Sequence, residues 1–224
     1  MVKEIYHGSG KIVKQPVFGL GNPRNDYGLG FYCTEDLDLA KEWAGSETTD
    51  GFANHYSIDL NGMRILDLNS PGYNVLNWMA MLLENRIFDL RTPAAIQGRH
   101  YLLEHFLPDY KSFDVIIGYR ADDSYFSFAK AFLDNGISLE QLSRALHLGG
   151  LGTQTVIKSR RAFDALVFKE AEAIDSSVFY PRKMARDRQA RESYFKMLEE
   201  TPVDAVYIVN IINEKWDNDE PRLR

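Results

Sequence analysis

The stretch that decides the fold reads Tyr27-Gly28-Leu29-Gly30-Phe31-Tyr32-Cys33-Thr34. Two glycines enclose one apolar residue, and two aromatic residues follow in a segment typical of a strand. Successive side chains of a strand point to opposite faces, so one of Phe31 and Tyr32 is expected in the core and the other is free to stack on a planar group. The alternative is a β-turn that leads into an aromatic strand without any ligand.

A second motif, His7-Gly8-Ser9, stands at the end of the predicted first strand. A histidine there can donate to or accept from a ligand hydroxyl, and the glycine beside it lets backbone approach a ligand closely. On its own, this motif is more often part of a turn than of a binding site. It therefore gains meaning only together with the first motif.

Apolar periodicity places strands at both ends of the chain and helices in the middle. Strands are predicted at 3–7, 29–34, 54–59, 63–68, 114–118, 153–159, 166–169 and 205–211. Helices are predicted at 34–43 with Thr34 as the cap, at 74–85, at 93–108, from Asp122-Asp123 onward, at 138–149 and at 182–200. Asn61-Gly62 predicts a hairpin between two of the strands. The chain is thus expected to be one α+β domain over 1–224, with a mostly helical middle at about 71–150.

Composition sets outer limits on function. The net charge of −6 argues against broad nucleic-acid binding and leaves a local basic patch open. The single cysteine, Cys33, excludes an internal disulfide, and the five histidines form no ligand motif, so no metal is expected. The sequence contains no signal peptide and no apolar run of about 20 residues, so we expect a cytoplasmic protein without membrane contact.

Taken together, the two motifs resemble those of the ADP-ribosyltransferase superfamily, in the branch that includes the poly(ADP-ribose) polymerases and diphtheria-type toxins. Those polymerases carry His-Gly-Ser or His-Gly-Thr and later Phe-Gly-Lys-Gly-Ile-Tyr-Phe. With the segment Gly118-Tyr119-Arg120-Ala121-Asp122-Asp123-Ser124-Tyr125-Phe126, nearly the whole chain looks like a bacterial family placed in this superfamily. Some members of that family are encoded beside small partner proteins, in a toxin–antitoxin style. The resemblance implies a split β-sheet core with a central helical insertion.

The resemblance also implies residue roles in binding NAD. His7 would hydrogen-bond the adenosine ribose, the Gly8 backbone would hold the nicotinamide carboxamide, and Tyr32 would stack on the nicotinamide ring. Trp43 would be a second aromatic against that ring, or alternatively pack its own helix onto the sheet. The cofactor-binding set is completed by Ser9, Tyr27, Gly30, Asp122 and Asp123.

The third catalytic position of the superfamily is a glutamate that opens a later strand. Its best match here is Gln154, in Gly152-Thr153-Gln154-Thr155-Val156-Ile157, which keeps a hydrogen-bonding group but carries no charge. Electrostatic stabilisation of a developing cation is normally a large catalytic term. Asp122 and Asp123 are candidates to supply the charge, and capping of the following helix is the alternative for them.

The resemblance implies an NAD-dependent mono-ADP-ribosyltransferase that acts on a protein or nucleic-acid target. One form of this hypothesis is a bacterial toxin with a small antitoxin partner. The alternatives are a catalytically weak NAD- or ADP-ribose-binding module, or an NAD glycohydrolase. An RNA 2′-phosphotransferase shares the fold, but its basic phosphate-binding set is not found around His7. A basic cluster is either a solvated helix face or a docking surface: Arg182, Lys183, Arg186, Arg188 and Arg191.

Overall fold

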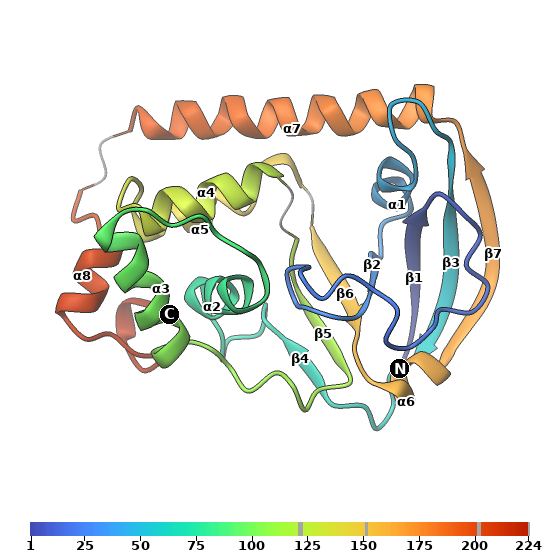
Figure 1. The fold of residues 1–224 in the computed structure, drawn as a ribbon, viewed down its shortest axis with the longest axis horizontal. Coiled ribbons are helices and arrows are strands. Elements are labelled where there is room, and N and C mark those ends of the chain that lie inside the picture. Colours follow the sequence, from blue (N-terminus) through green and yellow to red (C-terminus); the bar gives the residue numbers. More distant parts are fainter. Residues whose placement is uncertain (121–122, 151, 201–202, 224) are drawn as a thin grey trace.

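Two open β-sheets and a group of helices make up the computed structural model, which describes residues 1–120, 123–150, 152–200 and 203–223 (Figure 1). The first sheet is antiparallel and has the order β1 (Val2–Ser9), β3 (Gly51–Asp59), β7 (Leu166–Ile174). The second has the order β2 (Phe31–Cys33), β6 (Thr153–Ile157), β5 (Val115–Tyr119), β4 (Ile65–Asp67). Its last pair, β5 and β4, is parallel. The α+β class expected from the sequence is confirmed.

A single β-bridge links the backbones of the two sheets within the described residues. Tyr6 N donates to Thr34 O at 2.7 Å, and Thr34 N donates to Tyr6 O at 2.9 Å. Apolar side chains from both sheets fill the space between them, among them Ile5, Tyr56 and Ile157. Thr34 is the last residue of the first motif, and His7, which follows Tyr6, opens the second, so both motifs meet where the sheets are joined.

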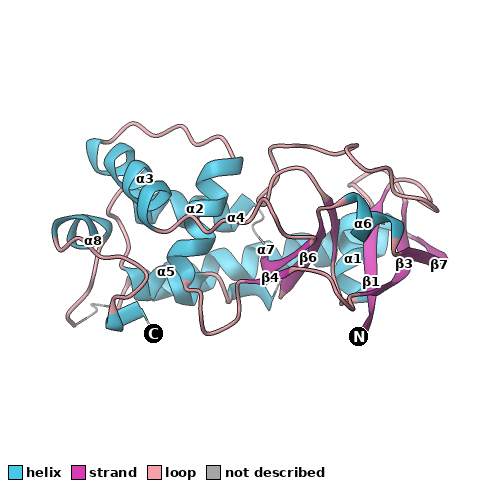
Figure 2. Ribbon diagram, turned by 90° about the horizontal axis from the view of Figure 1, so that it is seen from below, coloured by secondary structure: helices cyan, strands magenta, loops and turns pink. Residues whose placement is uncertain are grey.

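The helical half forms around a large core that contains Trp78 and Phe106 (Figures 1 and 2). It consists of α2 (Val75–Asn85), α3 (Pro93–His105), α4 (Asp123–Leu133), α5 (Leu139–Ala145), η1 (Leu148–Gly150), α8 (Ile208–Asn213) and η2 (Pro221–Leu223). Three predicted helix starts are confirmed, because Asn74 and Ser138 make capping boxes and Thr92 caps α3 ahead of Pro93.

The helices α1 and α7 and the short helix α6 adjoin the two sheets. α1 (Leu37–Ala44) packs on β1 and β3, and α6 (Arg160–Asp164) precedes β7. The long helix α7 (Ser176–Leu198) runs from the sheets to the helical half, as Figure 1 shows. It is joined to α1 by a buried ion pair, in which Arg186 donates to both carboxylate oxygens of Glu42 at 2.8 and 3.0 Å.

The predicted hairpin at Asn61-Gly62 is wrong. β3 and β4 belong to different sheets, and both edges of β3 are already occupied by β1 and β7. Gly62 still adopts a positive φ of 70°, but the turn carries the chain from one sheet to the other. Turn chemistry therefore located the turn correctly and misassigned the pairing.

Three further predictions need correction. Residues 205–211 were expected as a strand, but α8 begins at Ile208, because Ile208 and Ile211 are three apart and both fully buried on one helix face. Thr34 remains in the bridge, and Asp36 caps α1 instead by accepting from the backbone of Asp38 and Leu39. Helix α7 begins six residues before the predicted 182 and contains Pro181. Within the described residues, no helix is long and apolar enough to cross a membrane.

Candidate functional site

A cavity of about 120 Å³ opens where the two sheets meet. Its lining comes from β1, β2, α1, β6 and the residue after β5, and includes His7, Gly8, Tyr32, Trp43, Arg120 and Gln154. The three residues predicted to be catalytic, His7, Tyr32 and Gln154, lie on three different strands. The strand order brings them together at one place although 147 positions separate the first from the last.

The imidazole of His7 is held in one orientation. Its Nδ1 lies 2.7 Å from the carbonyl oxygen of Tyr32, so Nδ1 carries the proton and donates it. Burial lowers the pKa of His7 below its ordinary value; the Tyr32 hydrogen bond acts in the opposite direction, and the Arg120 charge lowers the pKa further. The ring is therefore neutral at pH 7, and Nε2 is left as a hydrogen-bond acceptor.

Gly8 is required by the packing of β1 against α1. A Cβ at this position would lie 2.1 Å from the carbonyl oxygen of Ala40 and 2.8 Å from the amide nitrogen of Ala44. The sequence motif indicated a close backbone approach, and the partner in the structure is a helix of the same chain. The backbone of Gly8 still lines the cavity.

Tyr32 presents its ring to the cavity and uses its hydroxyl to hold the preceding turn. The hydroxyl donates to Gly28 O at 2.5 Å and accepts from Tyr27 N at 3.1 Å. Burial is the main reason that the pKa of Tyr32 is raised; the Tyr27 hydrogen bond opposes this, and the nearby Asp26 charge adds to it. The neighbouring Phe31 packs against Tyr56 and Phe163, in the core between the sheets.

Gln154 is buried, with 4% of its surface exposed. Its Nε2 donates to Asp26 Oδ2 at 3.0 Å and to the carbonyl oxygen of Tyr119 at 3.2 Å. The same carbonyl accepts from the Tyr27 hydroxyl at 2.7 Å and from the Trp78 indole at 3.3 Å. The amide of Gln154 is thus fixed by groups outside the cavity that it lines.

Trp43 joins α1 to the site. Its ring lines the cavity, and cations lie over it from Arg120, 4.1 Å from the ring centroid, and from Lys183, at 3.9 Å. Its indole nitrogen is buried and has no acceptor among the residues that the structure describes. A planar ligand would have to displace a cation from a covered face of this ring in order to stack on it.

A second cavity of about 440 Å³ shares His7 and Tyr32 with the first. Gly30 and the segment 11–17 contribute to its lining, which includes the exposed Lys11 and Lys14. The side chains of His7 and Tyr32 thus stand between a small cavity and a larger one. A Cβ on Gly30 would lie 2.7 Å from Val156 Cγ1, so this glycine allows β6 to pass close to the turn.

Three described residues of the predicted set, Tyr27, Ser9 and Gly30, do not line the small cavity, and Gly30 lines the second cavity instead. Tyr27 is fully buried with its hydroxyl on the Tyr119 carbonyl, which makes it a core residue. Ser9 lies beyond the cavity, where its hydroxyl donates to Lys11 O and accepts from Asn54. Asp123 begins α4, and Asp122 lies outside the described residues.

Two residues that sequence reasoning missed stand in or beside the cavity. Asp26 is 5% exposed and contacts Gln154, and its Oδ1 lies 3.6 Å from Arg86 Nη1. Arg120 follows β5 and lines the cavity. Asp26 was missed because it lies in a segment rich in Asn, Pro and Gly, where an aspartate is typical of a turn. A sequence signal for Arg120 did exist, because it is the only basic residue of the segment 118–126 and it follows a predicted buried strand.

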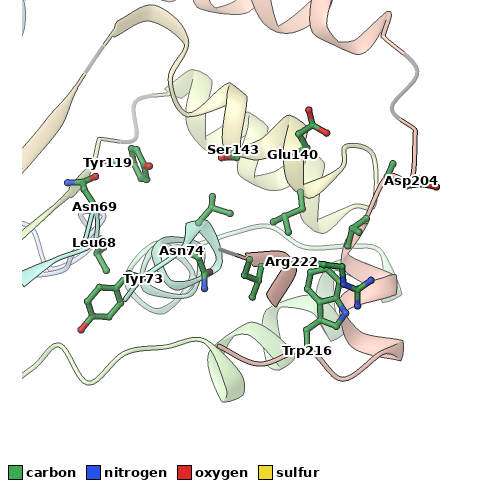
Figure 3. Close-up of a pocket in the computed structure, with 15 residues that line it drawn as sticks. Leu68, Asn69, Tyr73, Asn74, Tyr119, Glu140, Ser143, Asp204, Trp216 and Arg222 are labelled. Atoms are coloured by element: carbon green, nitrogen blue, oxygen red, sulfur yellow. The ribbon is translucent and has the colours of Figure 1, made fainter. Parts of the chain in front are cut away.

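A cavity larger than either of these lies elsewhere. It measures about 590 Å³ and lies in the helical half, between the end of β4, α5 and the C-terminal segment (Figure 3). Its lining includes Tyr73, Glu140, Trp216 and Arg222, and none of His7, Tyr32 and Gln154. Tyr119 connects it to the candidate site, because this residue lines the cavity and its carbonyl accepts a hydrogen bond from Gln154. No group of three or more His, Cys, Asp or Glu suited to a metal occurs in the part of the chain that the structure describes.

Comparison with known families gives one match. The chain belongs to the family described as "Protein of unknown function (DUF3990)", whose profile matches residues 3–168. The matched region contains His7, Tyr32, Gln154 and Asp26, and it ends before α7. No curated protein and no solved structure matches the chain.

Proposed function

We propose that the chain is an NAD-dependent mono-ADP-ribosyltransferase that modifies a protein or a nucleic acid. The observation that carries this proposal is the convergence of His7, Tyr32 and Gln154, from three strands, on one cavity between two sheets. These are the positions that resemble the histidine, tyrosine and glutamate of ADP-ribosyltransferases. Two sheets joined by a single bridge are also what the split β-sheet of that superfamily would require.

The dimensions of the two cavities support NAD as the substrate. A dry cavity of about 150 Å³ holds benzene in another protein, so the cavity of about 120 Å³ is close in size to one that holds a single aromatic ring. Nicotinamide would occupy this cavity against the Tyr32 ring. The adenosine side would extend into the larger cavity, where Lys11 and Lys14 offer cations to the diphosphate.

The chain's own groups would orient the substrate for bond cleavage. The bond between the nicotinamide nitrogen and C1′ of its ribose breaks, and the electron pair leaves with the ring, giving neutral nicotinamide and a cationic sugar. A nucleophile of the target then forms the new bond at C1′ and loses its proton. Nε2 of neutral His7 would accept from the adenosine ribose. Much of the rate gain would come from positioning.

Release of nicotinamide from NAD tests the proposal. His7→Ala removes one hydrogen bond and Tyr32→Ala one stacking surface, so each should lower kcat/KM about tenfold or more. The matched control is Tyr73→Ala, which removes a tyrosine from the cavity of 590 Å³ and should leave the reaction unchanged. Unchanged turnover in both site variants, or a loss confined to Tyr73→Ala, would overturn the assignment.

The neutral Gln154 favours a second candidate, a module that binds NAD or ADP-ribose without turnover. Calorimetric binding of NAD without release of nicotinamide would identify it. Nicotinamide release with water as the only acceptor would indicate an NAD glycohydrolase instead. A toxin role with a small antitoxin partner stays a prediction, which co-purification from the native host would test.

A further inference from the structure

The hydrogen bonds of Gln154 determine which of its side-chain atoms faces the cavity. The two groups around Nε2, the carboxylate of Asp26 and the carbonyl of Tyr119, can only accept, so the amide nitrogen must lie between them. Oε1 has no hydrogen-bond partner among the described residues, and it is not sealed from solvent. The atom that Gln154 offers to a ligand is therefore its carbonyl oxygen.

The Asp26 carboxylate behind this amide is buried and compensated. Its Oδ1 lies 3.6 Å from the guanidinium of Arg86, which favours the ionised form. The charge of Asp26 acts on the site. Burial is the main cause of the raised pKa of Tyr32, and the Asp26 charge raises that pKa further. A fixed negative charge thus stands directly behind the amide of Gln154.

We propose that Asp26 is a positioning residue of the transferase reaction and that it supplies, through Gln154, the charge that a glutamate would otherwise hold in the cavity. The inference rests on the proposed function. The Asp26 carboxylate accepts a hydrogen bond from the amide of Gln154. This hydrogen bond polarises the amide toward Oε1, and it strengthens the hydrogen bond that Oε1 accepts from a hydroxyl of the nicotinamide ribose. That interaction stabilises the cationic sugar as nicotinamide leaves with the bonding electron pair.

The same geometry explains why position 154 is an amide. A glutamate there would direct a carboxylate oxygen at Asp26 and at the Tyr119 carbonyl, and two carboxylates in such contact cannot both ionise. Gln154→Glu alone should therefore weaken the site. Asp26→Asn together with Gln154→Glu reverses the pair, because the new asparagine can donate to the new glutamate.

Kinetics of nicotinamide release test the inference. Asp26→Asn keeps an oxygen that can accept from Gln154 and loses the charge, so kcat should fall about tenfold while the affinity for NAD changes less than about threefold. The double variant should recover at least wild-type kcat. The control Asp114→Asn removes a carboxylate that is bonded to Ser159 at the far end of β5, and should leave kcat within about twofold.

Thermal unfolding gives a readout that does not depend on turnover. The shared proton of Gln154→Glu raises a carboxyl pKa in the folded state. This stability term is present at low pH and is lost as the pH rises, so the Tm of Gln154→Glu should fall behind that of the wild type between pH 5 and pH 8, by about 4 °C or more. The double variant should close the gap.

Different results would overturn different claims. Unchanged kcat in Asp26→Asn, with an active wild type, would overturn the role of Asp26 alone. A Tm of Gln154→Glu that follows the wild type at every pH would overturn the geometry of the pair. A wild type that releases no nicotinamide would overturn the proposed transferase and the role of Asp26 together.

Discussion

At the scale of single residues, His7 shows how burial determines chemistry. Its Nδ1–H is committed to the Tyr32 carbonyl, and its lowered pKa keeps the ring neutral. A neutral ring with Nε2 as acceptor can bind a ribose hydroxyl, whereas a protonated ring has no acceptor. The motif His7-Gly8-Ser9 predicted a polar contact but not its direction, because the tautomer depends on a strand 25 residues away.

A pH dependence follows for His7. The pKa of His7 in the folded state lies below the ordinary 6.5. The contribution of His7 to the free energy of unfolding is therefore complete above pH 6.5, and it is lost as the pH falls through the lowered pKa. Because Nε2 accepts only in the neutral ring, NAD affinity should be level from about pH 7 upward and should weaken in mild acid. Calorimetric titration across this range checks it. In His7→Gln, which cannot titrate, the mild-acid step should be absent; its persistence would assign the titration to another group.

Gly8 gives a prediction about stability. An added Cβ would overlap the Ala40 carbonyl at 2.1 Å, so Gly8→Ala must separate β1 from α1. We expect a loss of about 3 kcal/mol in the free energy of unfolding, measured by urea denaturation. Gly10→Ala is the matched control, since nothing lies within 4 Å of its Cβ, and it should change stability by less than about 0.5 kcal/mol. Equal stability of the two variants would show that the strand and helix can move apart freely.

At the scale of elements, three helix caps were predicted correctly from the sequence, whereas strand pairing was not. The caps at Asn74, Thr92 and Ser138 are local, so the neighbouring residues determine them. The pairing of β4 with β5 joins residues about 50 positions apart, and no local signal at Asn61-Gly62 reports it. A short apolar run such as 205–211 fits either a strand or a buried helix, and packing in the helical half determined the outcome.

The contact of α7 with α1 can be tested through Arg186. Glu42 is 4% exposed, so Arg186→Met would leave its carboxylate buried without its bidentate partner. The expected loss is about 3 kcal/mol in the free energy of unfolding, measured by denaturant titration. Arg188→Met, on the exposed side of the same helix, should change stability by less than about 0.5 kcal/mol. A similar small effect for Arg186→Met would mean that α7 is not anchored by this pair.

The basic cluster predicted on this helix is mostly engaged within the chain. Arg186 binds Glu42, Arg191 contacts Asp187 at 2.9 Å, and Lys183 lies over Trp43. The solvated-face interpretation holds for Arg188, which is exposed. The helix thus connects the site to the helical half as well as carrying charge at the surface.

At the scale of the whole molecule, the α+β class and the meeting of His7, Tyr32 and Gln154 were accessible from the sequence. Motif resemblance named these three positions, and the strand order places them at one cavity. Asp26 was not accessible, because its contact with Gln154 spans 128 residues and its loop has the composition of an ordinary turn. The cavity of 590 Å³ was not predicted either, since it is formed by residues of α5 and a C-terminal segment that is distant in sequence.

The most direct test of the account is a crystal structure of the protein with NAD. The account predicts the nicotinamide ring in the cavity of about 120 Å³ against Tyr32, with Gln154 Oε1 accepting from the adjoining ribose and Asp26 still bonded to Gln154 Nε2. NAD bound instead in the cavity beside Trp216, or bound with Tyr32 and Gln154 outside contact distance, would contradict it.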